Sequence, residues 1–226
     1  MIKVDKNINL NKKEILKYLH YNSNNIDEFV EKQINILIKR IIKISNIKFN
    51  YKIYNKKIKD HRLKLENNEV TFSSHKLIDH LKDSKKIVLF CLTLGKSIDR
   101  EIKKLTISDM SKALILDAVA TEYIEKIADQ LTKKIAFKNN LFESNRFSPG
   151  YGDLKLKEQN KILNILKANK KVGIYLNDEN LMIPQKSITA FFGLNENKLN
   201  NQKTCDYCIK KGNCQFRKEG KFCYEF

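Results

Sequence analysis

The sequence predicts an α+β fold in which mixed helices surround a mainly antiparallel sheet. Residues 47–54 alternate between apolar and polar side chains, which is typical of a strand. Residues 87–92 are a continuous apolar run and indicate a buried strand, whereas residues 107–137 repeat apolar side chains at helical spacing. A hydrophobic share of 42% supplies enough apolar surface for a buried core.

The elements of the N-terminal half follow from the spacing of apolar residues. Ile34, Leu37 and Ile41 recur at helical spacing, and Ser73 or Ser74 can cap the helix that follows. Glu66-Asn67-Asn68-Glu69 separates two short apolar segments, as in a hairpin. The predicted elements are a lead-in at 8–10, helices at 12–19 and 25–45, a strand at 47–54, a hairpin of 63–65 and 70–72, a helix at 74–81, a strand at 87–92 ending at Gly95, and a helix at 97–105.

The longest helix is predicted over residues 107–137, and it carries acidic residues on an apolar stripe. Asp117 lies on that stripe, with Thr121 and Glu125 one and two turns later. Burying such carboxylates without partners is costly, so we expect them to pair with lysines, with helix termini, or with a cationic ligand group such as an ammonium or sulfonium. A further helix is predicted over 156–168, with strands at 173–176 and 187–192.

Composition and charge limit the class of protein. The chain has 226 residues, a formal net charge of +18, no apolar run approaching the ~20 residues of a membrane span, and no apolar signal segment at its start. We therefore expect a cytoplasmic protein. The lysines are scattered, as an AT-rich genome would produce, and no block of five or six basic residues occurs, which argues against nucleic acid as a partner. A positive surface still favours acidic partners such as flavodoxin or ferredoxin.

The segment Arg146-Phe147-Ser148-Pro149-Gly150-Tyr151-Gly152, called the hook below, is the leading candidate for a binding site. The planar guanidinium group of arginine can bind a carboxylate through two parallel hydrogen bonds. Proline and glycine together favour a tight turn, which returns Tyr151 toward Arg146. This combination suits a small zwitterion such as an amino acid. The same residues also fit an ordinary surface turn beside a surface arginine.

The residue pattern of the hook resembles a motif of a known family. Arg-x-x-Pro-Gly-Tyr is similar to the signature of the activation domain of cobalamin (vitamin B12)-dependent methionine synthase. The similarity extends from roughly residue 85 to residue 194. It includes three further segments: Phe90-Cys91-Leu92-Thr93-Leu94-Gly95, Val172-Gly173-Ile174-Tyr175-Leu176, and residues 181–189 with their Pro-x-x-Ser.

The resemblance implies that the ligand is S-adenosylmethionine. Arg146 would bind its carboxylate, the backbone at Ser148 and Gly150 would contact the adenosyl part, and Tyr151 would line the site near the departing methyl group. In the family a glutamate of the long helix contacts the amino end of the ligand. Thr121 stands at that position here, which departs from the family, so the acidic candidates are its neighbours Glu122 and Glu125.

The implied role is that of an activation subunit for a cobalamin-dependent methionine synthase or related methyltransferase. The domain would present the methyl donor to cobalamin on a partner chain, where inactive cob(II)alamin is reduced and remethylated. Because the chain shows no homocysteine, folate or cobalamin module, we expect a free-standing subunit that does not turn over alone. The alternative is a non-enzymatic basic protein with a metal-binding tail that docks nucleic acid or a protein.

The five cysteines divide between the core and the tail. Cys91 lies in the predicted buried strand and is expected to be a core residue. The others fall within the last 22 residues, so we expect one domain over 1–200, with a helical segment at 1–45, and a cysteine-rich tail over 201–226. Four thiolates can complete a zinc site or hold an iron–sulfur cluster, and they can also be free or redox-active, whereas disulfides do not fit a reducing compartment. The candidate ligands are Cys205, Cys208, Cys214 and Cys223.

Overall fold

The fold is centred on a four-stranded antiparallel sheet. The computed structural model describes residues 2–21, 27–59, 62–198 and 212. The sheet has the strand order β1-β5-β9-β6. Its strands are β1 (Lys48–Tyr54), β5 (Lys86–Thr93), β9 (Ser187–Asn195) and β6 (Phe142–Glu143).

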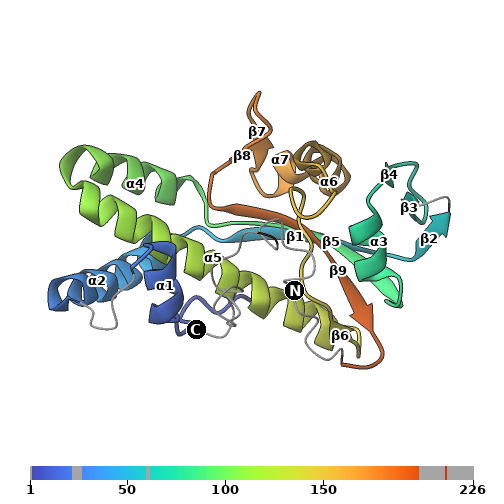
Figure 1. Ribbon diagram of the computed structural model, residues 1–226, viewed down its shortest axis with the longest axis horizontal. Helices are drawn as coiled ribbons and strands as arrows, with labels where there is room; N and C mark the ends of the chain where they lie inside the picture. The colour runs from blue at the N-terminus through green and yellow to red at the C-terminus, as the bar shows by residue number, and fades with distance from the viewer. Residues whose placement is uncertain (1, 22–26, 60–61, 199–211, 213–226) are drawn as a thin grey trace.

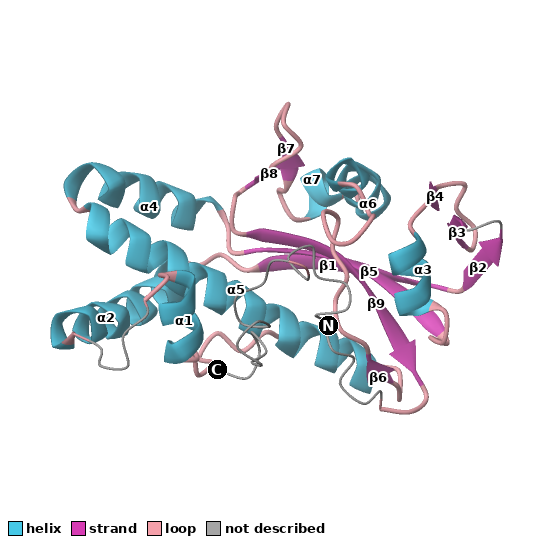
Figure 2. Cartoon of the chain, in the orientation of Figure 1, coloured by secondary structure: helices cyan, strands magenta, loops and turns pink. Residues whose placement is uncertain are grey.

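Helices cover both faces of this sheet, which explains the continuous apolar run of β5 (Figures 1 and 2). Val88, Phe90 and Leu92 of β5 face the layer formed by α5, whereas Ile87, Leu89 and Cys91 face the opposite layer. A strand buried on both faces loses the usual polar alternation. The first layer contains α1 (Lys12–Tyr18), α2 (Glu28–Ile44), α4 (Lys96–Ser108) and α5 (Met110–Lys138), and the second contains α3 (His75–Leu81), α6 (Gln159–Leu166) and α7 (Ala168–Lys171).

Two small sheets complete the described part of the chain. A three-stranded antiparallel sheet has the order β2-β3-β4, and a separate hairpin pairs β7 with β8 (Figure 1). Three residues join this hairpin to β9, so it leads into the start of that strand. The bounds are β2 (Lys56–Lys59), β3 (Arg62–Leu65), β4 (Thr71–Phe72), β7 (Tyr175–Leu176), β8 (Met182–Ile183) and a 3-10 turn η1 (Leu156–Glu158).

The α+β fold predicted from the sequence is confirmed, and two helix boundaries are corrected. The predicted helix 107–137 starts only at Met110, because Asp109 has an extended backbone, ends α4 and caps α5 by accepting a hydrogen bond from the Lys112 N–H at 3.0 Å. The predicted helix 156–168 is interrupted at Lys167, whose φ of 50° is left-handed. The short strands β2, β6 and β8 were not predicted, because each is only two to four residues long.

Asp117 does not lie inside an apolar face. Its side chain is half exposed and forms an ion pair with Nζ of Lys186 at 2.9 Å. The same ammonium group donates to Oγ1 of Thr121 at 2.9 Å. The expected pairing of this carboxylate with a lysine is therefore confirmed, and it ties α5 to the start of β9.

The structure tests the prediction for Cys91 and does not cover the four cysteines of the tail. Cys91 is fully buried in the core on the α6 side of the sheet, as predicted. Cys205, Cys208, Cys214 and Cys223 lie outside the described residues, and so does the predicted metal or cluster site. Across the described ranges, no helix combines the length and apolarity that crossing a membrane requires.

Gly193 of β9 makes a close contact that a larger residue would block. A Cβ at this position would lie 1.9 Å from Oγ and 2.7 Å from Cβ of the buried Ser84. We expect Gly193→Ala to lower the free energy of unfolding by about 1–3 kcal/mol, the usual cost of overpacking. Chemical denaturation measures this loss. Adding Ser84→Gly removes the clashing atoms and should restore part of the stability, whereas an equally unstable double variant would contradict the explanation.

Candidate functional site

The hook is anchored to the edge of the main sheet. The N–H of Phe147 donates to the carbonyl of Phe191 at 2.8 Å, and the N–H of Phe191 donates back at 2.9 Å. The chain then turns, because the Tyr151 N–H donates to the Ser148 carbonyl at 3.1 Å. Gly150 takes a φ of 94° in this turn, a conformation that glycine adopts without strain. The predicted tight Pro-Gly turn is therefore present.

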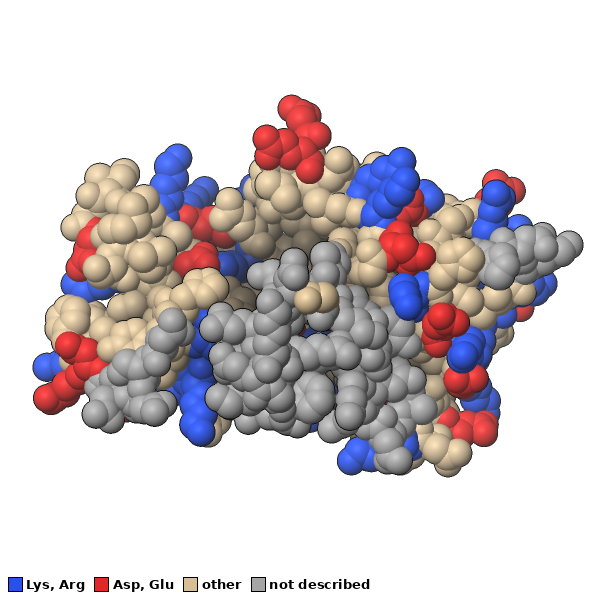
Figure 3. All heavy atoms as spheres, viewed as in Figure 1, with Lys and Arg blue, Asp and Glu red and all other residues tan. Residues whose placement is uncertain are grey.

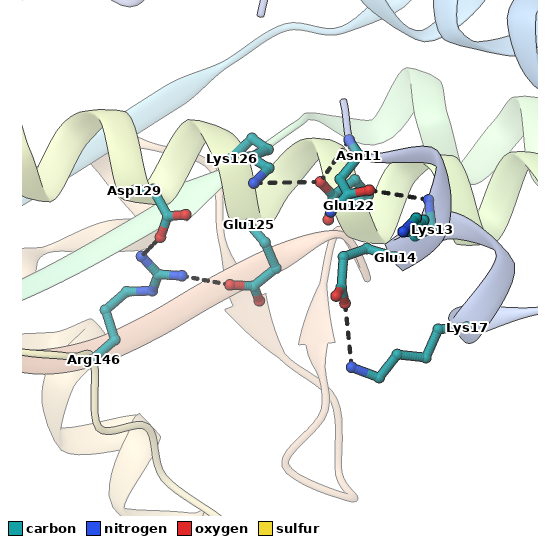
Figure 4. Close-up of polar contacts among 9 residues, drawn as sticks. All are labelled: Asn11, Lys13, Glu14, Lys17, Glu122, Glu125, Lys126, Asp129 and Arg146. Atoms are coloured by element: carbon teal, nitrogen blue, oxygen red, sulfur yellow. Dashed lines mark hydrogen bonds and ion pairs between the residues drawn. The ribbon is translucent and has the colours of Figure 1, made fainter. Parts of the chain in front are cut away.

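Arg146 projects from the hook toward two carboxylates on α5 (Figure 4). Its Nη2 lies 2.6 Å from Oε2 of Glu125, and its Nη1 lies 2.5 Å from Oδ1 of Asp129. The two acids are four residues apart, so they lie on one face of the helix. Arg146 is 18% exposed, and the two carboxylates are about half exposed.

The electrostatics of this triad favour a partner with positive charge. Burial lowers the pKa of Arg146, but the carboxylates of Glu125 and Asp129 outweigh that effect and raise it, so the guanidinium stays charged. One positive and two negative charges leave the triad with a net charge of −1. Two of the five N–H donors of the guanidinium are used by the acids, and the remaining donors can bind a further carboxylate.

A cavity of about 860 Å³ opens beside the triad. This volume is within the range of small-molecule sites. Its walls come from α5, the hook, β6, the start of α6, the β7–β8 hairpin and β9. Its lining includes the triad, Ser148 and Tyr151 of the hook, and Thr189 of β9.

The structure brings most of the predicted site residues together. Arg146, Ser148, Tyr151 and Glu125 line the same cavity. Gly150 forms the turn between them, and its N–H donates to the carbonyl of Leu154 at 2.7 Å. Any contact from Gly150 to a ligand would therefore use its carbonyl oxygen or its Cα.

Glu122 lies elsewhere. It is 3% exposed and packs against the N-terminal segment, where it accepts a hydrogen bond from the Asn11 N–H at 3.1 Å and lies 3.7 Å from Nζ of Lys126 (Figure 4). Burial is the main cause that raises the pKa of this carboxyl. The structure therefore separates Glu122 from Arg146 and gives Glu125 the position beside it.

The sequence did not single out Asp129 or Thr189, which also line the cavity. Asp129 was detectable, because it follows Glu125 by four residues in the same predicted helix. Thr189 was quoted only as part of the family resemblance, and its place in the cavity depends on the pairing of β9 with segments far away in sequence. In the described part of the chain, no cluster of three or more acidic, histidine or cysteine side chains could hold a metal ion.

His80 contacts the residue that precedes the hook, and it should make the free energy of unfolding depend on pH. Its ring Nε2 lies 2.7 Å from the carbonyl of Asn145, next to Arg146, and burial lowers its pKa below the ordinary 6.5. The unfolded chain therefore takes up a proton at higher pH than the folded chain does. We expect the contribution of His80 to stability to be complete above pH 6.5. As the pH falls from 6.5 to the pKa of the folded chain, the free energy of unfolding should fall by about 1.4 kcal/mol for each unit by which folding lowers the pKa of His80.

The measurement is the midpoint of denaturant unfolding across this pH range. His80→Gln keeps an N–H donor but does not titrate, so its stability should depend less on pH in the same window. An unchanged pH profile in the variant would contradict the assignment to His80.

Comparisons with known proteins identify a family and a similar fold. Residues 50–199 match the family model of the vitamin B12 dependent methionine synthase, activation domain. Thirteen solved chains match. One is the crystal structure of the MetH reactivation domain bound to AdoHcy, with a TM-score of 0.60 and 16% identity over 88% of this chain and 74% of that chain. No curated protein sequence matches the chain.

Proposed function

The chain belongs to the family of vitamin B12 dependent methionine synthase activation domains, and from this premise we propose that its cavity binds S-adenosylmethionine. We propose further that it supports the reductive methylation of cob(II)alamin held by a partner domain or chain. The observation that carries the proposal is the meeting of Arg146 with Glu125 and Asp129 at one end of the cavity.

This end of the cavity is complementary to an amino acid group. The remaining donors of Arg146 match a carboxylate, and the two acids of α5 match an ammonium group. The ligand carries one negative and two positive charges, and the two charges of its amino acid end have opposite charges to pair with in the triad. The neighbour of similar fold is bound to AdoHcy, the thioether that S-adenosylmethionine becomes when its methyl group leaves.

The residues of this chain would act by positioning. Arg146, Glu125 and Asp129 hold the amino acid end, the hook backbone at Ser148 and Gly150 contacts the adenosyl part, and Tyr151 lines the site near the sulfonium. Holding the reacting groups in one geometry removes part of the entropic barrier. Glu122 is not among these proposed ligand contacts and instead holds the N-terminal segment on α5.

The reaction is balanced by one external electron. The bond between sulfur and the methyl carbon breaks, the methyl group moves to cobalt, and the products are methylcobalamin and S-adenosylhomocysteine. Cobalamin supplies the reduced metal that accepts the methyl group. An acidic electron carrier such as flavodoxin or ferredoxin is the proposed source of the electron, because the chain carries a net charge of +18.

Nucleic acid is a weaker candidate partner. On the face shown in Figure 3, basic and acidic side chains are interspersed, and acidic side chains gather at the tip of the β7–β8 hairpin. A nucleic-acid site usually requires a continuous basic patch. Affinity for DNA or RNA that falls steeply with salt would support that alternative.

Calorimetric titration of S-adenosylmethionine into the purified chain tests the ligand. We expect saturable binding with one site per chain. The second step adds a cobalamin-binding methionine synthase chain, cob(II)alamin and a reductant, and follows methylcobalamin by its absorption. Binding without methyl transfer would keep the ligand and contradict the proposed role, whereas absence of binding in both experiments would contradict both.

A further inference from the structure

Within the described part of the chain, β9 has no partner strand at the edge where the hook leaves the sheet. Phe191 exchanges two backbone hydrogen bonds with Phe147, and Gly193 is bonded to Ser144 on the same side, through its carbonyl and through its N–H. In an antiparallel ladder, alternate residues turn their N–H and C=O groups toward the same neighbour. The next residue of β9 in this series is Thr189, so its backbone groups also point to this edge.

Among the residues that the structure describes, no strand covers the edge at Thr189, which pairs only with β5 on its other side. Continuing the register from the Phe147–Phe191 bridge would place Pro149 opposite Thr189. Proline has no N–H to donate, and the Pro-Gly turn directs the chain away from the sheet at this point. Thr189 and Pro149 therefore face the cavity together, and both line it.

The hydroxyl group of Thr189 is a buried polar group at this edge. Thr189 is 2% exposed, and its Oγ1 has no hydrogen-bond partner among the described residues. Its neighbour on the same face, Ser187, differs: that hydroxyl donates to the carbonyl of Pro184 at 2.6 Å and lies 2.9 Å from Oγ1 of Thr93. Leaving a buried hydroxyl unsatisfied is costly, so a group kept in this state in a cavity is suited to a ligand.

The cavity extends around the open edge from one face of the sheet to the other. Arg146 and Ile188 lie with the α5 layer, whereas Thr189, like Phe191, faces the α6 layer. Leu156 lies next to the turn of the hook, since its Cδ1 would be 3.7 Å from a Cβ at Gly150. Together with Met182 and Tyr151, it gives this side of the cavity apolar and aromatic walls around few polar groups.

We propose that Thr189 determines base specificity by binding the 6-amino edge of adenine. This inference rests on the proposed function, because the triad fixes the amino acid end of the same ligand on the other side of the edge. The edge of adenine offers a donor at its amino group and an acceptor at N1. In this assignment the hydroxyl of Thr189 accepts from the amino group and its backbone N–H donates to N1, and the flat base fits between the apolar walls.

Thr189→Val tests the proposal, because valine has the same shape and lacks the hydroxyl. We expect the affinity for S-adenosylhomocysteine to fall by about 3- to 10-fold, the usual effect of one lost hydrogen bond. Thr189→Ser keeps the hydroxyl and should retain most of the affinity. Removing an unsatisfied buried hydroxyl should also leave the melting temperature of the ligand-free chain unchanged or raise it. A lower melting temperature for Thr189→Val would show a structural role and overturn the inference.

A second ligand separates the base from the rest of the molecule. The 6-deamino analogue of S-adenosylhomocysteine carries a hydrogen in place of the 6-amino group and keeps N1, the ribose and the amino acid, so the hydroxyl of Thr189 has no group to pair with at that position. Wild type should prefer the adenosyl compound, and Thr189→Val should lose most of that preference. An equal loss of affinity for both compounds would overturn the assignment to the base while leaving the proposed function intact. Absence of binding to wild type would overturn both.

Discussion

Replacing Arg146 by alanine is expected to weaken the binding of S-adenosylmethionine by about 10- to 150-fold while the chain remains folded. The loss corresponds to about 1.5–3 kcal/mol for a charged, bidentate contact. The variant also leaves Glu125 and Asp129 without their cation. Because both carboxylates are about half exposed, water can solvate them, and the hook keeps its anchor through Phe147 and Phe191.

Two controls make this result specific to the carboxylate of the ligand. Arg146→Lys keeps the charge but loses the planar fork, so it should bind more weakly than wild type and better than Arg146→Ala. Decarboxylated S-adenosylmethionine lacks the group that Arg146 is proposed to bind, and its affinity should not fall in Arg146→Ala. Equal losses for both ligands, or a collapse of the unfolding midpoint, would contradict the role given to Arg146.

The sequence predicted the parts of the site that depend on local structure. Proline, glycine and the positive φ of Gly150 define the turn within four residues, and the double-sided burial of β5 follows from its apolar run. The helix that carries Glu125 was also predictable from its period. These features require no knowledge of distant partners, because the local backbone and the burial pattern determine them.

The remaining features depend on contacts between distant segments. The helical period places Glu122, Glu125 and Asp129 within two turns of α5, but only the tertiary fold sets Asn11 against Glu122 and Arg146 against the other two. Thr189 lines the cavity because Phe147 pairs with Phe191, and beyond that bridge the described residues place no strand along the edge. The boundary between α4 and α5 at Asp109 was missed for a local reason. The apolar period continues through Asp109, but this single capping residue interrupts the helix.

Neutralising Glu125 and Asp129 of α5 should weaken the binding of S-adenosylmethionine and strengthen the binding of an analogue that lacks the ammonium group. In Glu125→Gln combined with Asp129→Asn, the ammonium group of S-adenosylmethionine loses its partners, and the net negative charge of the triad is removed. We expect its affinity, measured by calorimetry near neutral pH, to fall by about 10-fold or more. Arg146 is released from its two ion pairs at the same time, so more of its donors can reach a ligand carboxylate.

The desamino analogue of S-adenosylhomocysteine, which keeps the carboxylate and lacks the ammonium group, should therefore bind the double variant more tightly than it binds wild type. Opposite changes for the two ligands separate charge recognition from damage to the fold, because damage would weaken both. Glu122→Gln is the matched control: it removes a carboxylate from the same helix that lies outside the cavity, and it should change neither affinity. If Glu122→Gln weakened S-adenosylmethionine and the double variant did not, the amino end of the ligand would belong to Glu122, and the triad would be only a structural ion pair.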